Sequence, residues 1–206
     1  VLRETLTITG TGDGFVQTGA VSGTGDLHFS LPGKTAFLLA PNTSAGDLYV
    51  DLGTLTVTNA AALGTGTVYV NEEETSTNKT LCLDKGMSIS NPLVLGSEET
   101  ACWAERIRYR NGTFNQNGKI TVHHSKLAAQ AARVHVMGGI EGDKVVFAPN
   151  ADSAFVVETE PPTLTECLWT GGAGTVRLAV AGTEAPSVYG FGTPTLVLEG
   201  TNFFPH

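Results

Sequence analysis

Residues Gly53–Val70 read GTLTVTNAAALGTGTVYV, and this stretch decides the fold. Thr54–Thr58 and Thr67–Val70 are short runs in which apolar and polar residues alternate, which is the pattern of half-buried β-strands. Runs of this kind recur along nearly the whole chain, and Gly, Asn, Pro, Ser and Asp lie between them as turn residues. The sequence therefore predicts an all-β protein with many short strands.

A local unit repeats along the chain: a Gly-led turn, a strand with alternating Leu or Val, and a turn of small residues or Asn-Thr. Such units begin at Gly33, Gly174 and Gly192. A single coil of about 22 residues cannot bury its own hydrophobic face, so the coils must stack. At that length the chain would form roughly nine coils. Such stacking is compatible with a parallel solenoid. An antiparallel β-sandwich is the alternative, because it also contains many short strands with regular turns.

Composition excludes several classes of protein. The 206 residues are 41% hydrophobic and only 16% charged, which argues against disorder. The net charge of −8 disfavours a nucleic-acid-binding protein and electrostatic docking on an anionic membrane. No apolar run approaches the ~20 residues that a membrane-spanning helix needs, so we expect no membrane insertion.

Gly19–Val70 resembles the autotransporter-associated β-strand repeat of bacterial secreted passenger domains. The segments that carry this resemblance, which extends over about half of the chain, are Gly23–Leu27, Gly33–Thr35, Asn42-Thr43, Gly53–Val70, Ser88–Leu95 and Gly171–Thr175. Residues 100–162 depart from the pattern. The resemblance implies a right-handed parallel β-helix on the outside of a bacterium.

The resemblance also implies a function. We expect residues 1–206 to be a single solenoid domain and a fragment of a longer secreted chain. It would be a non-catalytic, adhesin-like passenger, extracellular or at the cell surface, that presents loops to an acidic glycan, to a host or neighbouring cell, or to a second copy of itself. The alternatives are a carbohydrate-binding module and a β-helical polysaccharide lyase or hydrolase that acts on an acidic glycan.

Motifs for catalysis or metal binding are missing from the sequence: it has no P-loop, GxSxG, HExxH or paired CxxC. We expect no catalytic residue, cofactor or metal. His123 and His124 would face opposite sides of a strand and could not grip one metal ion. Glu72–Glu74 and Glu98-Glu99 could supply an acid and a base to a glycosidase, but they are more typical of solubilising loops. Aromatic residues could stack on sugar rings or pack in the core: Trp103, Trp169, Tyr109, Tyr189 and Phe203-Phe204.

Six of the twelve basic residues lie between Arg106 and Arg133 of this acidic chain. They alternate with apolar residues, so their side chains should share strand faces. Planar guanidinium groups suit sulfate and carboxylate. We therefore predict an anion-binding surface made by Arg106, Arg108, Arg110, Lys119, His123, Arg133 and His135. The alternative is a solvated face that is neutralised by Glu98, Glu99, Glu105 or Glu141.

Two further expectations concern local structure. Ser125–Arg133 is rich in Ala and begins with a residue suited to an N-cap, which predicts a short helix of about two turns. Cys82 and Cys102 are about one coil apart in the sequence. Residues stacked on successive coils lie about 4.8 Å apart, which is within the range that a disulfide requires. We therefore expect Cys82 and Cys102 to form a disulfide if the compartment is oxidising. Cys167 would then remain as a buried thiol.

Overall fold

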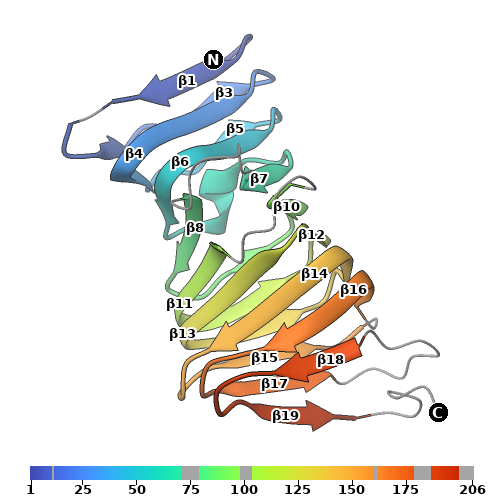
Figure 1. Cartoon of the computed structure of the whole chain (residues 1–206). Helices are drawn as coiled ribbons and strands as arrows, with labels where there is room; N and C mark the ends of the chain where they lie inside the picture. Colours follow the sequence, from blue (N-terminus) through green and yellow to red (C-terminus); the bar gives the residue numbers. More distant parts are fainter. Residues whose placement is uncertain (11, 71–78, 98–103, 160–161, 179–186, 200–206) are drawn as a thin grey trace.

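The chain folds into a β-solenoid of about eight turns, as a computed structural model shows. Its strands are parallel and stack coil on coil. The structure describes residues 1–206 except 11, 71–78, 98–103, 160–161, 179–186 and 200–206. The coils follow one another from the N-terminal coil at the top of Figure 1 to the C-terminal coil at the bottom. Every pairing between the described strands is parallel, which confirms the predicted β-helix and excludes the sandwich.

The strands line three faces of the solenoid. The first face contains β1 (Leu6–Thr9), the first halves of β4 (Leu27–Leu38) and β6 (Leu48–Val57), then β7 (Val68–Val70), β10 (Leu93–Leu95), β12 (Ile120–Val122), and the beginnings of β14 (Ile140–Pro149) and β16 (Thr163–Thr170).

The second face is at the front of Figure 1. It contains β2 (Phe15–Gln17), the second halves of β4 and β6, then β8 (Lys79–Asp84), the first halves of β11 (Glu105–Gln116) and β13 (Ser125–Val136), the ends of β14 and β16, and β18 (Ser187–Gly190).

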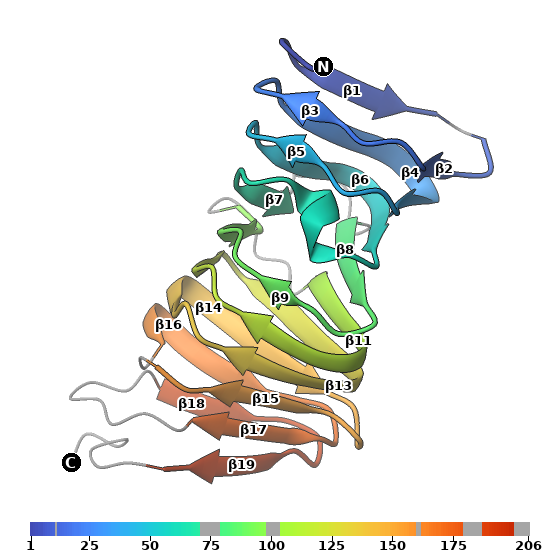
Figure 2. The same ribbon diagram turned by 180° about the vertical axis from the view of Figure 1, so that it is seen from behind.

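The third face is visible from behind in Figure 2. It contains β3 (Ser22–Gly23), β5 (Thr43–Ser44), β9 (Ser88–Ile89), the second halves of β11 and β13, then β15 (Ala154–Val157), β17 (Thr175–Leu178) and β19 (Thr195–Leu198). A short 3₁₀ helix, η1 (Ala60–Leu63), is capped by the side chain of Asn59.

Inward-facing side chains form columns that run along the axis of the solenoid. One column on the first face pairs equivalent positions of successive coils, and all of its members are buried: Leu27, Leu48, Val68, Leu93, Ile120 and Ile140. Because stacked strands lie about 4.8 Å apart, each side chain packs on its equivalents above and below. The apolar residues of the period-two pattern therefore form one continuous core.

Glycine occupies a corner where successive backbones come into close contact. A Cβ on Gly46 would lie 2.2 Å from the carbonyl oxygen of Gly25, and a Cβ on Gly66 would lie 2.2 Å from that of Gly46. Both distances are far shorter than any real Cβ contact, so only glycine allows the coils to stack here. The same restriction recurs at Gly118, whose Cβ would lie 2.0 Å from the carbonyl oxygen of Asn91.

Buried amide side chains satisfy the polar backbone groups of the corner before the first face. Asn42 accepts a bond of 2.6 Å from Gln17 and donates one of 2.6 Å to the carbonyl of Ala62 on the next coil. Further along, Asn91 donates to the carbonyl of Gly66, and Gln116 donates to that of Asn91. An unpaired buried backbone group is costly, so these amides let the chain turn inside the stack.

The predicted helix over 125–133 is wrong, because Ser125–Val136 is strand β13. β13 pairs with β11 on one side and with β14 and β15 on the other. The hydrogen bonds to both neighbouring coils outweigh the helix propensity of alanine, which is worth only a few tenths of a kcal/mol per residue, roughly 0.7 at most for ordinary residues. Its alanines serve as small strand residues, and Ala129 and Ala132 are buried in the core.

Register also places Cys82 differently from the expected disulfide. The residue stacked on Cys82 in the following coil is Arg108, and Cys82 is a free, buried thiol. Cys102 lies outside the described residues, as does the side chain of Cys167. Burial raises the pKa of the Cys82 thiol, so this group favours the neutral form.

Substitution of Gly46 tests the close approach at the corner. We expect Gly46→Ala to destabilise the fold by about 1–3 kcal/mol, the usual cost of overpacking, because the new methyl group collides with backbone. Gly19→Ala is the matched control, since a Cβ there meets nothing within 4 Å. Urea unfolding followed by far-UV circular dichroism measures both changes. Equal stabilities of the two variants would contradict the steric argument.

Candidate functional site

The seven predicted anion-binding residues do not form one patch, because the corners of the coils place them on three faces. Arg108 and Arg110 lie on the second face, on β11, and are half-buried. Lys119 and His123 flank β12 on the first face. Arg133 and His135 lie on the part of β13 that belongs to the third face. The remaining residue, Arg106, is fully buried.

Arg106 owes its position to a bulge in β11. Glu105 pairs with Lys126 and Ile107 pairs with Leu127, so Arg106 is the extra residue between two consecutive pairs. The strict alternation expected over 106–110 therefore holds for Arg108 and Arg110 but not for Arg106.

Three of the seven predicted residues, Lys119, His123 and His135, contact carboxylates on neighbouring coils. Lys119 contacts Glu141 at 2.8 Å, and His123 contacts Asp143 at 2.9 Å. The bond from Lys119 is the main reason why the pKa of Glu141 is lowered, and the bond from His123 is the main reason for the lowered pKa of Asp143. The predicted neutralisation by Glu141 is confirmed on the first face.

A second group of ion pairs involves the carboxylate of Glu166. Lys144 and His124 both contact it, and the bond from Lys144 is the main reason why the pKa of Glu166 is lowered. On the third face, His135 contacts Glu158 at 2.6 Å. The contacts of Lys144 and His135 join one coil to the next, and that of His124 reaches across two coils.

Three aromatic side chains in contact with one another lie on the outside of the second face. Trp169 of β16 stacks on Tyr189 of β18, with ring centroids 5.1 Å apart, and lies 6.0 Å from the ring of Phe191. Tyr189 and Phe191 are 51% and 49% exposed. Exposed aromatic rings in contact with one another are unusual on a soluble surface and indicate a binding site.

These rings border a groove of about 570 Å³. The described residues that line it are Lys126, Val146, Ala148, Trp169, Gly172 and Phe191. They come from β13, β14, β16 and the turns that follow β16 and β18. The volume lies within the usual range of small-ligand sites, about 300–1,000 Å³.

Two outward columns of the stack create the groove. In one column, Ala128 pairs with Ala148, and both carry small side chains. In the other, Lys126 pairs with Val146, which pairs with Trp169, which pairs with Tyr189. The ring of Phe191 lies at the lower end of the column that contains Ala128 and Ala148. It covers Gly171, where a Cβ would come within 2.5 Å of the ring.

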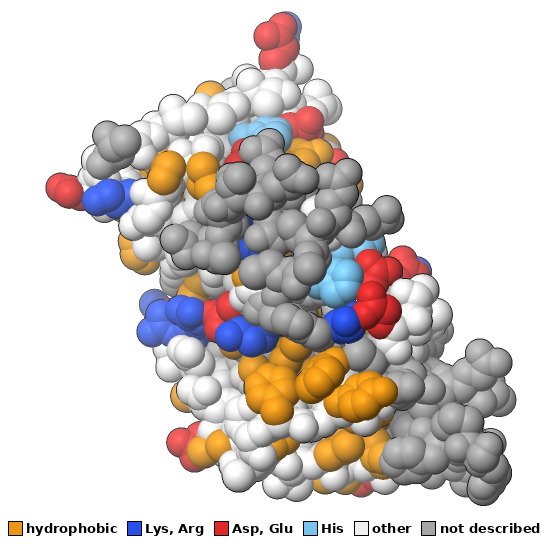
Figure 3. Space-filling model, in the orientation of Figure 1, with side chains coloured by type: hydrophobic (Ala, Val, Ile, Leu, Met, Phe, Trp, Pro, Cys, Tyr) orange, Lys and Arg blue, Asp and Glu red, His pale blue; other side chains and the backbone are white. Residues whose placement is uncertain are grey.

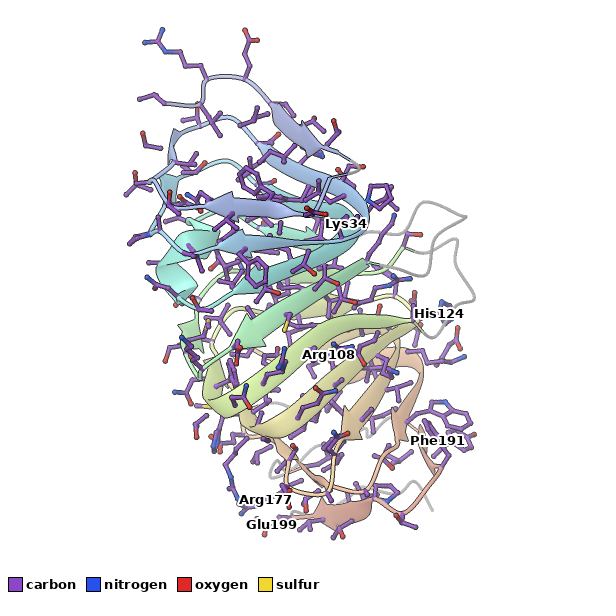
Figure 4. The ribbon with its side chains drawn as sticks, turned by 90° about the vertical axis from the view of Figure 1, so that its left-hand side faces the viewer. Lys34, Arg108, His124, Arg177, Phe191 and Glu199 are labelled. Atoms are coloured by element: carbon purple, nitrogen blue, oxygen red, sulfur yellow. The ribbon has the colours of Figure 1, made fainter. Side chains whose placement is uncertain are left out.

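Charged side chains lie beside the aromatic groove. Figure 3 shows a band of Lys, Arg and acidic side chains that crosses this face directly above a cluster of hydrophobic ones. Arg108 bonds to Glu105 at 2.5 Å, and Lys126 lies 3.6 Å from the same carboxylate. Phe191 and Arg108 are labelled in Figure 4, which views the solenoid from the side. The groove therefore combines an apolar surface with a charged edge.

The sequence identified part of this site. Trp169 and Tyr189 were among the aromatic residues predicted to stack on sugars or to pack in the core. Tyr109 instead belongs to the core, in edge contact with the ring of Phe114, and burial raises the pKa of its hydroxyl. The other aromatic candidates and both glutamate clusters lie outside the described residues: Trp103, Phe203-Phe204, Glu72–Glu74 and Glu98-Glu99.

Lys126 and Phe191 were not predicted, although a signal existed. Each lies about one or two coil lengths from another residue of the groove, so the repeat period would have placed them in adjacent columns.

Over the described ranges, no three His, Cys, Asp or Glu residues form a group that could hold a metal ion. No helix in those ranges has the length and hydropathy needed to cross a membrane.

Comparisons with protein-family models, with curated proteins and with solved structures returned no match.

The pair of His123 and Asp143 predicts an acid-sensitive contribution to stability. The pKa of Asp143 is lowered in the fold, so its stabilising effect is present above the unfolded pKa of about 3.9 and is lost as the pH falls through the folded value. Asp143→Asn should lower the melting temperature by roughly 1–3 °C at pH 6, since exposed pairs contribute little. This difference should vanish near pH 2. Asp152→Asn, at an exposed turn, is the control, and a difference independent of pH would contradict the ionic role.

Proposed function

We propose that this chain is a non-catalytic, adhesin-like β-solenoid that binds a glycan in the aromatic groove of its second face. The contact of Trp169 with Tyr189 and Phe191 beside the groove is the observation that carries the proposal. Sugar rings present flat apolar C–H faces and polar edges. An aromatic surface with charged groups at its margin complements both.

The groove suits a chain-like ligand better than an isolated small molecule. It lies along the outside of stacked coils, and its lining residues come from several successive strands. Aromatic side chains provide large contact areas at a small cost in conformational entropy, which is why they dominate binding energies at many interfaces. We infer that consecutive sugars of one glycan contact Trp169 and the exposed rings of Tyr189 and Phe191.

Hydrolysis of a glycan is the second candidate, and the carboxylates near the groove favour binding instead. Glycosidases pair an ionised carboxylate with an acid whose pKa is raised. The pKa of Glu166 is lowered by Lys144, and Glu105 is held by Arg108. A lowered pKa is the opposite of what the general acid needs, so Glu166 does not suit that role, and the described part of the site supports recognition.

The cellular setting of the proposal comes from the sequence. The repeat over Gly19–Val70 resembles secreted bacterial passenger domains, which supports a location outside the cell or at its surface. A groove on the side of a solenoid remains accessible when the ends of the stack are occupied by other coils. We therefore propose that the glycan belongs to a host cell or to a neighbouring cell.

Truncation of Phe191 tests glycan binding without disturbing the core. We expect Phe191→Ala to weaken binding by about 1–3 kcal/mol, the scale of one stacked ring against an aromatic side chain. Phe37→Ala is the matched control, because Phe37 is 38% exposed on the same face but several coils away from the groove. An array of neutral and acidic oligosaccharides identifies the ligands, and isothermal titration calorimetry then compares the variants.

An array without a bound glycan would contradict the proposal. So would equal weakening by Phe191→Ala and Phe37→Ala, since the groove would then have no special role. Release of reducing or unsaturated sugars from the same oligosaccharides would favour the enzymatic alternative.

A further inference from the structure

The edge of the groove has a fixed arrangement of charge. Glu105, at the start of β11, lies between two cations: Arg108 on its own strand and Lys126 on the next coil. Arg108 directs Nε and a terminal nitrogen to the same oxygen of Glu105, each at 2.5 Å. This pair is rigid and half-buried, and it leaves the charge of Glu105 compensated by Arg108.

Lys126 is the cation that faces the groove. Its Nζ lies 3.6 Å from Glu105, which is too far for a hydrogen bond, and its side chain is 34% exposed. An ammonium group carries three donors. Because Lys126 also lines the groove with Val146 and Trp169, its donors are available at the place where a sugar stacked on the aromatic surface would end.

The other charges on this face do not cancel that of Lys126. Glu166 is already in contact with Lys144 and His124, and Asp84 accepts a bond of 2.8 Å from the amide of Asn111. Arg110 adds a further positive charge beside Arg108 on β11. Among the described residues at this edge, positive charge is in excess by one, with Arg108, Arg110 and Lys126 against Glu105 and Asp84, although the chain as a whole has a net charge of −8.

We propose that the groove is selective for a glycan that contains uronic acid. The ring of the uronic acid packs beside Trp169 and Phe191, and its carboxylate accepts hydrogen bonds from Lys126. This inference rests on the proposed function, since it specifies the glycan that the same groove binds. A neutral glycan would leave Lys126 desolvated and without a matching anion.

Methyl esterification provides a matched pair of probes, because it removes the charge and keeps the ring. Hexagalacturonate and hexamannuronate would each be titrated as the free acid and as the full methyl ester, by isothermal titration calorimetry at low and moderate salt. At least one free acid should bind roughly tenfold more tightly than its ester, the scale of a hydrogen bond to a charged group. The preference should shrink as salt is added.

Lys126→Gln should weaken binding of the free acid by roughly tenfold and so remove most of its preference over the ester, because the positive charge that its carboxylate contacts is lost. Lys34→Gln is the control, because Lys34 is half-buried on β4, far above the groove and Arg108 in Figure 4. Melting temperatures establish that both variants fold.

Equal binding of acid and ester would overturn the inference, and so would a preference that survives Lys126→Gln. Neutral glycans bound on the array, with no free acid favoured, would overturn the selectivity but leave glycan binding in place. An array with no ligand at all would instead overturn the proposed function.

Discussion

Hydrogen bonding between successive coils, about 4.8 Å apart, is the constraint on which the rest of the structure depends. It brings corner backbones so close that Gly46 and Gly66 have no space for a Cβ. It also buries the polar groups of the corners, which the amides of Asn42 and Asn91 then satisfy. Side chains that point inward become a continuous core, and those that point outward become columns. The regular spacing therefore determines both stability and surface.

The candidate site follows from these columns. The side chains of Ala128 and Ala148 are small, so their column projects little from the surface. The neighbouring column projects further because it contains Val146 and Trp169, and the groove is the hollow beside it. Residues that cooperate in the groove are distant in sequence and adjacent in register. The same principle distributes charge, because Lys126 and Arg108 meet Glu105 only through the pairing of β11 with β13.

The sequence predicted the fold better than the site. Alternation and Gly-led turns predicted an all-β fold, since both are local signals, and the resemblance to passenger-domain repeats favoured the parallel solenoid over the sandwich. Ser125–Arg133 was wrongly predicted as a helix, because helix propensity takes no account of the two neighbouring coils that pair with β13. The basic segments were assigned to one surface, but the face on which each one lies depends on where the chain turns. Corners and bulges, such as the one at Arg106, have weak sequence signals, and an error of one corner moves a side chain to another face.

The direction of the hydrogen bonds has a mechanical consequence. In a solenoid they run parallel to the long axis, which extends from the first coil to the last in Figure 1. A force applied to the two ends of the chain therefore peels off a terminal coil, because its bonds open one after another from the free edge, whereas each inner coil is held by neighbours on both sides. The chain should lengthen in steps of one coil, about 70 Å for 20 residues at full extension. Such a stack would yield gradually under tension and would absorb work in many small events.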